Sequence, residues 1–487
     1  MQKIRIKSKV SLAILILLFV LPACSDWLTV APENDLIKEK FWTKREDVNA
    51  AIAATYNTFR DASMQSFIFG EVRADMVTFS TTSFGDYDKI AKSDISPTNG
   101  AVNWSNYYSA INLANTLMYY DKEVLAKDKT FTQEMKNGID AEALFIRSMS
   151  YFYLLRVWKN VPLVLEPSIS DTTNLFLPRS DENVIISQII TDLLKAKDLA
   201  TVPVASDKLS DYFYGRANKY SIMSLLADVY LWNEQYQECM DYCDSVTNSG
   251  LYSLESYTTW FNLYYPGNSN IESICEIQFN DNLPDQENPI YNDMIKLPNG
   301  NIQISPTKNM ASLFAIEDLR LVVPRGPIWK YKGLDNLSSA TRADNQRDAS
   351  WILYRYADII LMKAEAACEL NQFTEANSLV RQTMERAGLT HVDVGDKVIL
   401  RKVILDERGR EFFMEGKRWF DLLRAAKRNK FANKDLLVAM ILSGAATVQQ
   451  REILATKVND TNAYYLPIPQ HDIDYNQYLI QNPYYDR

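Results

Sequence analysis

The apolar residues of several segments recur at intervals of three and four positions along the chain. In one such segment the apolar positions are Ile222, Leu225, Leu226 and Val229. This spacing is typical of one face of an α-helix, whereas a strand would alternate apolar and polar residues. The same spacing occurs within 139–158 and after Ile359. The pattern predicts a mainly α chain built from amphipathic helices.

Two of these helices continue into a second helix in the same way. The stretch 225–243 (LLADVYLWNEQYQECMDYC) aligns with 362–380 (MKAEAACELNQFTEANSLV) and places Tyr236 opposite Phe373. Each stretch has small residues that let two helices approach closely, and an aromatic residue directly after the turn. This arrangement is typical of a tetratricopeptide-like helix hairpin. Further helices are expected at 104–120, 139–158 and 183–199.

Long irregular segments separate the predicted hairpins, which lie much further apart than the period of about 34 residues in a tandem array. The two largest excursions cover 66–103 and 251–350, and the second includes a β-prone piece at 274–279. Long loops in a compact domain are usually functional, and rigid scaffolds commonly carry binding residues on them. We therefore predict a mainly α fold: an interrupted tetratricopeptide-like helix-hairpin superhelix with long loops and a few short β-strands. Any binding site is expected on the excursions.

The chain begins with four basic residues, the apolar run Val10–Leu21, a small residue and then Cys24. This order is typical of an export signal, and the run is too short for a spanning helix, which needs about 20 residues. The sequence Leu21-Pro22-Ala23-Cys24 resembles the bacterial lipobox, in which the cysteine becomes the lipidated first residue. Several acyl chains on one residue make a stable membrane anchor. Ordinary cleavage beside an incidental cysteine is the alternative.

These features predict the organisation of the whole chain. A lipoprotein signal peptide at 1–23 would be removed, and residues 24–40 would form a lipidated tether. A single helical domain would follow at 41–487, and it would carry both excursions.

The composition excludes several classes of function. The net charge of −9 is scattered along the chain, whereas a nucleic-acid partner would require clustered Lys and Arg. Only two histidines are present, His391 and His471, so a histidine-rich metal site is excluded. Cys239 and Cys243 have no second cysteine pair nearby, as a zinc site would need, and their place in a hairpin indicates packing. We expect no metal and no cofactor.

The segment ILDERGREFFMEGKRWFDLLR (404–424) places Glu407, Glu411 and Glu415 on one face of a helix. Two carboxylates about 5–9 Å apart are the catalytic groups of glycosidases, so this face could be an active site. However, the segment also carries arginines that can pair these acids, and aromatic residues that bury the neighbouring faces. A structural ion-pair network is the favoured interpretation, and we expect the protein not to be an enzyme.

Five segments carry motifs that occur together in one known family. They are CSDWLTVAPENDL at the predicted mature N-terminus, EALFIRSMSYFYLLRVWKNVPLV, YRYADIILMKAEAACELN, DERGREFFMEGKRWFDLLR and the closing YYLPIPQHDIDYNQYLIQNPYYD. In this order they resemble the SusD/RagB family, outer-membrane lipoproteins of Bacteroidetes that capture nutrients, usually glycans. Ser148, Asp358 and Tyr484 depart from the family pattern.

The resemblance implies a cellular role and a partner. A SusD-like protein would bind its ligand at the cell surface and deliver it to a SusC-like TonB-dependent transporter in the outer membrane. No covalent chemistry is implied. A sugar presents an apolar face to an aromatic ring and a rim of hydroxyls to polar side chains, so its site combines a few of each.

Side chains of both kinds occur on the two excursions. The first excursion supplies five candidate ligand-binding residues: Arg73, Asp75, Phe84, Asp86 and Tyr87. The second supplies Tyr291, Trp329 and Tyr331. Trp329 lies in PRGPIWKYKG, where proline and glycine favour exposure. Trp104 begins a predicted helix and Trp260 lies in YTTWFNLYY, so both are expected to pack in the core.

Three other functions remain open from the sequence. A surface glycoside hydrolase would use Glu411 and Glu415. A pure interaction scaffold would bind the transporter but no small ligand. Capture of a peptide or another nutrient would use the same loops as capture of a sugar.

Overall fold

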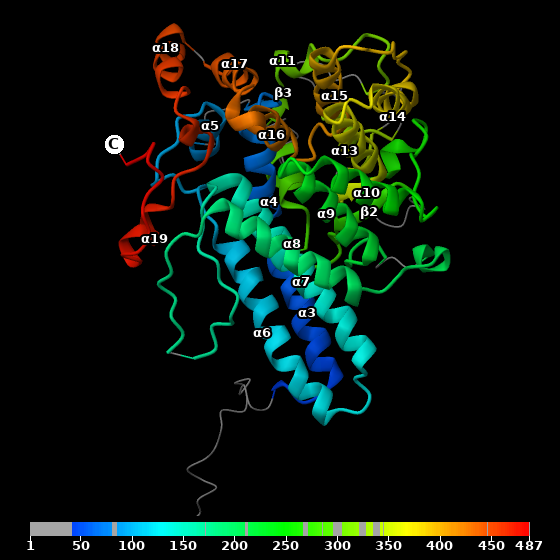
Figure 1. Ribbon diagram of the computed structural model, residues 1–487, viewed down its shortest axis with the longest axis vertical. Helices are drawn as coiled ribbons and strands as arrows, with labels where there is room; N and C mark the ends of the chain where they lie inside the picture. The colour runs from blue at the N-terminus through cyan, green and yellow to red at the C-terminus, as the bar shows by residue number, and fades with distance from the viewer. Residues whose placement is uncertain are drawn as a thin grey trace, which may run out of the picture.

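Helices dominate the structure, which is a computed structural model (Figure 1). It describes residues 41–79, 85–170, 172–209, 213–265, 271–284, 286–295, 304–320, 328–334, 341–343, 345–445 and 447–486. Within these ranges no helix has both the length and the apolar character needed to cross a membrane. The strands are short, so the predicted mainly α class is confirmed.

The long helices pack in chain order, each against the next, from the lower end of the molecule in Figure 1 to its upper right. They are α3 (Arg45–Arg60), α6 (Ser105–Lys127), α7 (Gln133–Trp158), α8 (Glu182–Leu199), α9 (Lys219–Trp232), α10 (Tyr236–Thr247), α13 (Tyr356–Glu369), α14 (Phe373–Arg386) and α15 (Lys397–Glu411). The second excursion does not interrupt the stack, because α10 packs directly on α13. The predicted superhelix of helix pairs, which the excursions interrupt along the sequence but not in space, is confirmed.

The two aligned hairpins, α9–α10 and α13–α14, turn in the same way. The first turns through Glu234 and the second through Asn371, which are equivalent in the alignment and have φ angles of 59° and 64°. Cys239 and its counterpart Ala376 are both fully buried. Small side chains at this position let the helices of each pair pack closely, as the alignment predicts.

Side-chain caps fix where several of the helices begin. The side chain of Thr132 accepts a hydrogen bond from the backbone N–H of Met135 at the start of α7. The Asn218 side chain accepts one from Tyr220 at 2.9 Å at the start of α9. Such caps satisfy backbone N–H groups that have no partner inside the helix.

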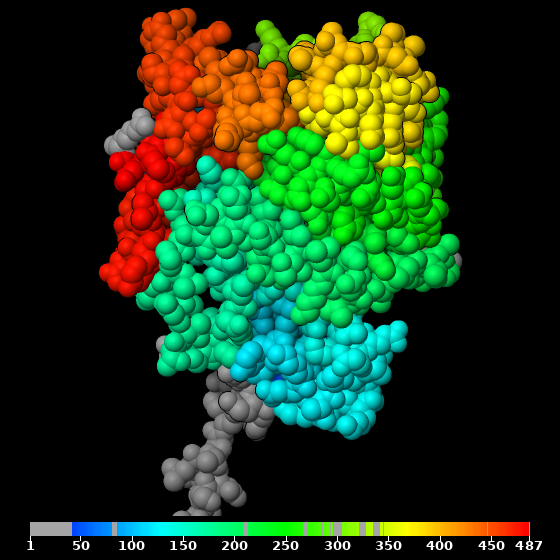
Figure 2. Space-filling model, viewed as in Figure 1, coloured from blue at the N-terminus to red at the C-terminus, as the bar shows by residue number. Residues whose placement is uncertain are grey.

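The C-terminal helices are α16 (Arg418–Phe431), α17 (Asp435–Ser443), α18 (Val448–Lys457) and α19 (Gln470–Tyr475). The last segment of the chain, which includes α19, lies along one edge of the molecule and is shown in red in Figure 2. Hydrogen bonds tie this segment to the end of α7: the indole Nε1 of Trp158 donates to the carbonyl of Pro467 at 2.8 Å. Leu466 N donates to Val157 O, also at 2.8 Å.

The two excursions pair with each other and with the helical scaffold through short antiparallel strands. β1 (Val77–Phe79), in the first excursion, pairs with β3 (Ile304–Pro306), in the second. β2 (Ser273–Ile277), also in the second excursion, pairs with β4 (Trp351–Arg355), which leads directly into α13. Short helices fill the rest: α4 (Ser63–Phe67), the π-helix η2 (Ile68–Val72), α5 (Gly85–Ala91), the 3₁₀ helices η4 (Ala205–Leu209) and η5 (Trp260–Asn262), the π-helix η6 (Tyr291–Ile295), α11 (Lys308–Ala311), α12 (Trp329–Lys332) and the 3₁₀ helix η7 (Thr461–Tyr464).

The turn between α15 and α16, residues 412–417, anchors both excursions, and we call it the anchor turn. From the first excursion, the Glu71 carboxylate accepts hydrogen bonds from the N–H of Met414 at 2.6 Å and of Gly416 at 3.0 Å. From the second excursion, the Lys330 ammonium donates to the carbonyl of Phe413 at 2.7 Å. Both loops are therefore fastened to the scaffold at the anchor turn, in addition to the β2–β4 pairing of the second excursion.

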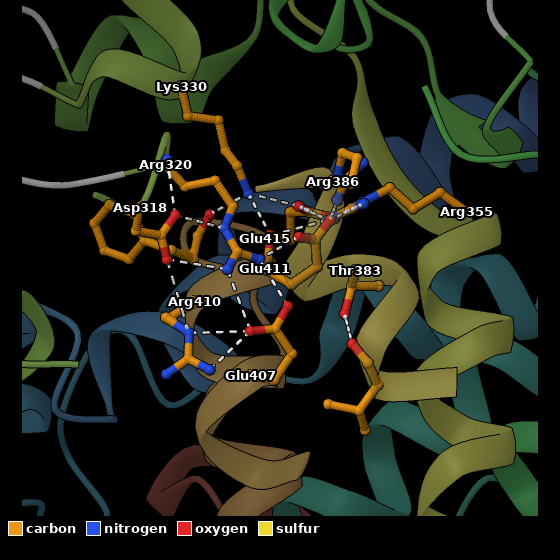
Figure 3. A network of polar contacts seen from close by, with 12 residues as sticks. Asp318, Arg320, Lys330, Arg355, Thr383, Arg386, Glu407, Arg410, Glu411 and Glu415 are labelled. Atoms are coloured by element: carbon orange, nitrogen blue, oxygen red, sulfur yellow. Dashed lines mark hydrogen bonds and ion pairs between the residues drawn. The ribbon is translucent and has the colours of Figure 1, made fainter. Parts of the chain in front are cut away.

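A buried ion-pair network lies beside the anchor turn (Figure 3). The side chains of Glu407, Glu411 and Glu415 point into one cluster of cations, and relative exposures of 0%, 0% and 3% show that all three glutamates are buried. The cations come from the second excursion, from β4, from α14 and from α15 itself: Arg320, Lys330, Arg355, Arg386 and Arg410. This network joins the second excursion to the helices.

The electrostatics of these glutamates fit a structural role. Burial alone would raise the pKa of Glu415, but Arg355 and Lys330 hold it at about 2. Burial would likewise raise the pKa of Glu411, yet three arginines keep it well below its usual range. A glycosidase general acid needs a raised pKa. The carboxylates are also out of contact with solvent, so the structural interpretation of the segment is confirmed. The predicted common helix face is wrong for Glu415, because α15 ends at Glu411 and Glu415 lies in the anchor turn.

Candidate functional site

Both excursions line a pocket of about 300 Å³ formed by β1, α5, α11 and the end of α17, elements found towards the top of Figure 1. Within the described part of the chain its walls carry one aromatic ring, that of Phe79, together with hydroxyl, amide and charged groups. These polar groups include Arg73, Asp75, Asp88, Lys92, Asn309 and Ser443. The composition is that of a site for a small polar ligand with an apolar face.

Thr307 positions the part of the second excursion that lines the pocket. Its N–H donates to the carbonyl of Met76 at 3.0 Å, and its hydroxyl donates to the carbonyl of Asp75 at 2.5 Å. The same hydroxyl oxygen caps α11 by accepting from Met310 N at 3.0 Å. Asn309, on α11, donates to the Ser443 hydroxyl at 2.7 Å. This chain of contacts joins the two excursions to α17 around the pocket.

Each carboxylate of the pocket already has a cationic partner. The side chain of Asp75 lies 3.3 Å from Arg418 Nε. Asp88 pairs with Lys92 one helical turn later on α5, at 2.5 Å. Lys308 is exposed at the rim. The two acids are thus neutralised within the protein.

Arg73 lines the same pocket from a buried position. Only 2% of the residue is exposed, and its guanidinium carbon lies 3.9 Å from the centre of the Trp419 ring. Its Nε and Nη1 are buried without a hydrogen-bond partner. Burial lowers the pKa of this guanidinium to about 10, a shift that nearby Tyr485 and Tyr465 oppose, so the group stays charged at neutral pH.

Two family models cover nearly the whole chain. Residues 227–485 match the model described as "SusD family", and residues 26–231 match one described as "Starch-binding associating with outer membrane". The chain belongs to the SusD family. The resemblance inferred from the five sequence segments is confirmed.

Curated relatives carry the same family name. SusD-like protein P38 of Formosa agariphila is 26% identical, and the match covers 86% of this chain and 91% of the relative. A SusD-like protein of Bacteroides ovatus is 29% identical over 306 residues, which is 57% of this chain and 51% of the relative.

Solved structures share the fold. A SusD superfamily protein from Bacteroides vulgatus matches with a TM-score of 0.75 and 21% identity, over 91% of this chain and 100% of its own. A laminarin-binding SusD-like protein matches with a TM-score of 0.70 and 22% identity, over 91% of this chain and 99% of its own.

The pocket of this SusD-family chain brings together two of the predicted ligand-binding residues of the first excursion, Arg73 and Asp75. Asp86, on α5, instead accepts a hydrogen bond from Gly100 N at 3.0 Å and so shapes the following loop. Tyr87 is partly buried and packs against the core. Phe84 and the predicted lipidation site Cys24 lie outside the described residues.

Two of the three predicted residues of the second excursion are buried rather than exposed. Tyr291 and Tyr331 are only 1% and 2% exposed, so neither ring presents a face to a ligand in this structure. Tyr331 is buried because α12 packs on the anchor turn, where the tyrosine hydroxyl donates to Met414 O at 3.0 Å. Tyr331 was a candidate ligand contact, and this packing covers it. The expectation that proline and glycine would expose the segment was made for Trp329. Trp329 is partly buried against the core.

Several polar residues of the pocket escaped the sequence argument, among them Asp88, Lys92, Lys308, Asn309 and Ser443. The i, i+4 spacing of Asp88 and Lys92 is a helix-pair signal, but it occurs on many surface helices. Thr307 followed by a helix-forming stretch could have indicated a capped helix at Asn309. Nothing local in the sequence marks Ser443, which reaches the pocket only through the packing of α17.

A second, more open hollow of about 840 Å³ lies on the other side of the loop that Asp86 shapes. It is lined by the segment 97–105, by the outer face of α6 and by the start of α19. Trp104 borders this hollow but is only 6% exposed, and Trp260 is also 6% exposed. The prediction that both tryptophans pack in the core is confirmed.

Proposed function

We propose that this SusD-family protein is an outer-membrane lipoprotein that binds an oligosaccharide at the cell surface and delivers it to a SusC-like TonB-dependent transporter. The observation that carries the proposal is the pocket on which both excursions converge. It offers one ring, Phe79, and several hydrogen-bonding side chains within a volume of about 300 Å³. The role of the transporter follows from the family resemblance.

The chemistry of the pocket suits a sugar ring. The apolar face of a pyranose can lie against Phe79, while its hydroxyls can exchange hydrogen bonds with Asn309, Ser443 and the carboxylate of Asp88. The laminarin-binding neighbour of the same fold and the starch-binding description of the N-terminal family model support a glycan as the ligand class. Binding is expected to proceed without bond cleavage.

The pocket is tested by Asn309→Ala in calorimetric titrations of protein starting at Ser25 against a panel of purified oligosaccharides. One lost hydrogen bond contributes about 0.5–1.5 kcal/mol, so we expect about three- to tenfold weaker binding of whichever oligosaccharide the wild type binds. The matched control is Asn459→Ala, another exposed asparagine with one hydrogen bond, which lies past the end of α18. Its affinity should equal that of the wild type.

Several results would contradict this proposal. Equal binding by the Asn309 variant and the wild type would place the sugar elsewhere. If the wild type binds no oligosaccharide of the panel, the result would favour a peptide or another nutrient as the ligand, or a pure interaction scaffold. Release of reducing sugar during the titration would indicate a hydrolase.

The anchor is tested by Cys24→Ala expressed in a bacterium that processes lipoproteins. Without the thiol no acyl chain can be attached, so we expect the variant to leave the membrane fraction, while wild-type protein stays in it. Mass spectrometry of the wild-type N-terminal peptide should show an acylated Cys24. Membrane association that survives the substitution would contradict anchoring through this residue.

A further inference from the structure

Arg73 stands out because it is a buried charge without an anionic partner in the described part of the chain. Arginines that are buried this deeply are normally paired or fully hydrogen-bonded. Here Nε and Nη1 make no hydrogen bond, and stacking on Trp419 is the main contact of the guanidinium. Since Arg73 also lines the pocket, the missing partner can be supplied by a ligand.

The other charged residues of the pocket also favour an anionic ligand. Asp75 is occupied by Arg418 at 3.3 Å, and Asp88 by Lys92 at 2.5 Å. Lys308, exposed at the rim, pairs with no carboxylate within the described ranges. Among the described residues, the pocket therefore holds two acid–base pairs and two further cations, the buried Arg73 and the exposed Lys308.

We propose that this pocket selects an acidic sugar unit, whose carboxylate or sulfate group pairs with Arg73 while Lys308 attracts it at the rim. This inference rests on the proposed function and names the class of glycan within it.

An anion suits Arg73 better than a neutral hydroxyl does. A carboxylate can accept two parallel hydrogen bonds from one guanidinium, an arrangement that adds both energy and geometric specificity. A hydroxyl could accept one N–H but would leave the buried positive charge uncompensated, in surroundings where screening by water is weak. Stacking on Trp419 holds the plane of the guanidinium in place, so little ordering is required when the anion arrives.

The test is a calorimetric comparison of matched ligands at constant ionic strength. The probes are oligogalacturonate, alginate oligosaccharide, sulfated carrageenan oligosaccharide and neutral laminarin oligosaccharide, with the carboxyl-reduced or desulfated form of each acidic probe. We expect at least one acidic probe to bind at least tenfold more tightly than its neutralised form, and to weaken as salt is raised. Preference for the uronates identifies a carboxylate as the recognised group, and preference for carrageenan identifies a sulfate.

Two variants connect this preference to the pocket. Arg73→Met replaces the aliphatic stem by another unbranched apolar chain and removes the charge, so it should lose at least tenfold in affinity for the acidic probe. Because a buried substitution can disturb folding, Lys308→Ala provides a surface variant, for which we expect about threefold weaker binding and a smaller salt dependence. Lys457→Ala, an exposed lysine at the end of α18, is the matched control and should bind like the wild type.

The possible outcomes distinguish this inference from the proposed function on which it rests. Equal affinity for acidic and neutralised probes, or binding of laminarin oligosaccharide alone, would overturn the acidic-sugar inference and leave glycan capture intact. An acidic preference that persists unchanged in Lys308→Ala and in a folded Arg73→Met variant would also overturn it. Absence of binding to every probe would count against both.

Discussion

Replacing Glu411 by glutamine should lower the free energy of unfolding by about 3–5 kcal/mol, the usual effect of removing one partner from a buried ion pair. The Glu411 carboxylate accepts hydrogen bonds from Arg320 at 2.6 Å and Arg355 at 2.5 Å, and it also pairs with Arg386. A neutral amide cannot compensate three buried guanidinium groups, and its NH₂ would point at one of them. Urea denaturation followed by circular dichroism measures the loss.

The pH dependence gives a second readout of the same change. Because the folded pKa of Glu411 lies well below its ordinary value near 4.5, its contribution to stability is present above that pH and declines as the pH falls. The variant should therefore lose less stability than the wild type on acidification below pH 4.5. Glu46→Gln, in an exposed pair with Arg45, is the control and should unfold like the wild type. A fully stable Glu411 variant that fails to bind ligand would instead assign this residue to a site.

Gly70→Ala should be nearly as damaging, with a loss of about 3 kcal/mol, at the upper end of the range for overpacking. A methyl group on Gly70 would lie 1.8 Å from the carbonyl oxygen of Gly416. The obstacle is backbone, which cannot rotate away as a side chain can. The anchor turn would have to move, and the two hydrogen bonds from Met414 and Gly416 to Glu71 would lengthen.

Thermal melting and urea denaturation of Gly70→Ala check this prediction. Gly395→Ala is the matched control, because a methyl group there meets no atom within 4 Å. It should melt with the wild type. If the two alanine variants were equally stable, Gly70 and Gly416 would not be in close contact in solution.

The parts of the fold that depend on neighbouring residues could be predicted from the sequence. The helix hairpins follow from local periodicity, and the alignment of Tyr236 with Phe373 found both turns correctly. The structural role of the three network glutamates followed from the arginines beside them. Their main cations could not be foreseen, because Arg320 and Arg386 come from segments with no local link to them.

The candidate pocket was predicted only in part, for the same physical reason. Arg73 and Asp75 lie on the excursion where a site was expected. Pro and Gly around Trp329 indicate a turn but not whether tertiary packing covers it, and neighbouring Tyr331 is buried. The β1–β3 pairing, which brings Asn309 to the pocket, involves three residues from each strand, and so short a strand leaves almost no pattern in the sequence.

The anchor turn also has a consequence for the order of folding. Glu71 and Met414 are separated by 343 residues, whereas each helix hairpin closes between adjacent segments. Contacts between residues so far apart require the closure of a very large loop, and such contacts slow folding. The hairpins can form as soon as their own residues are available, but the pocket must wait for the anchor turn. A growing chain therefore gains most of its helices before it gains the ability to hold a ligand.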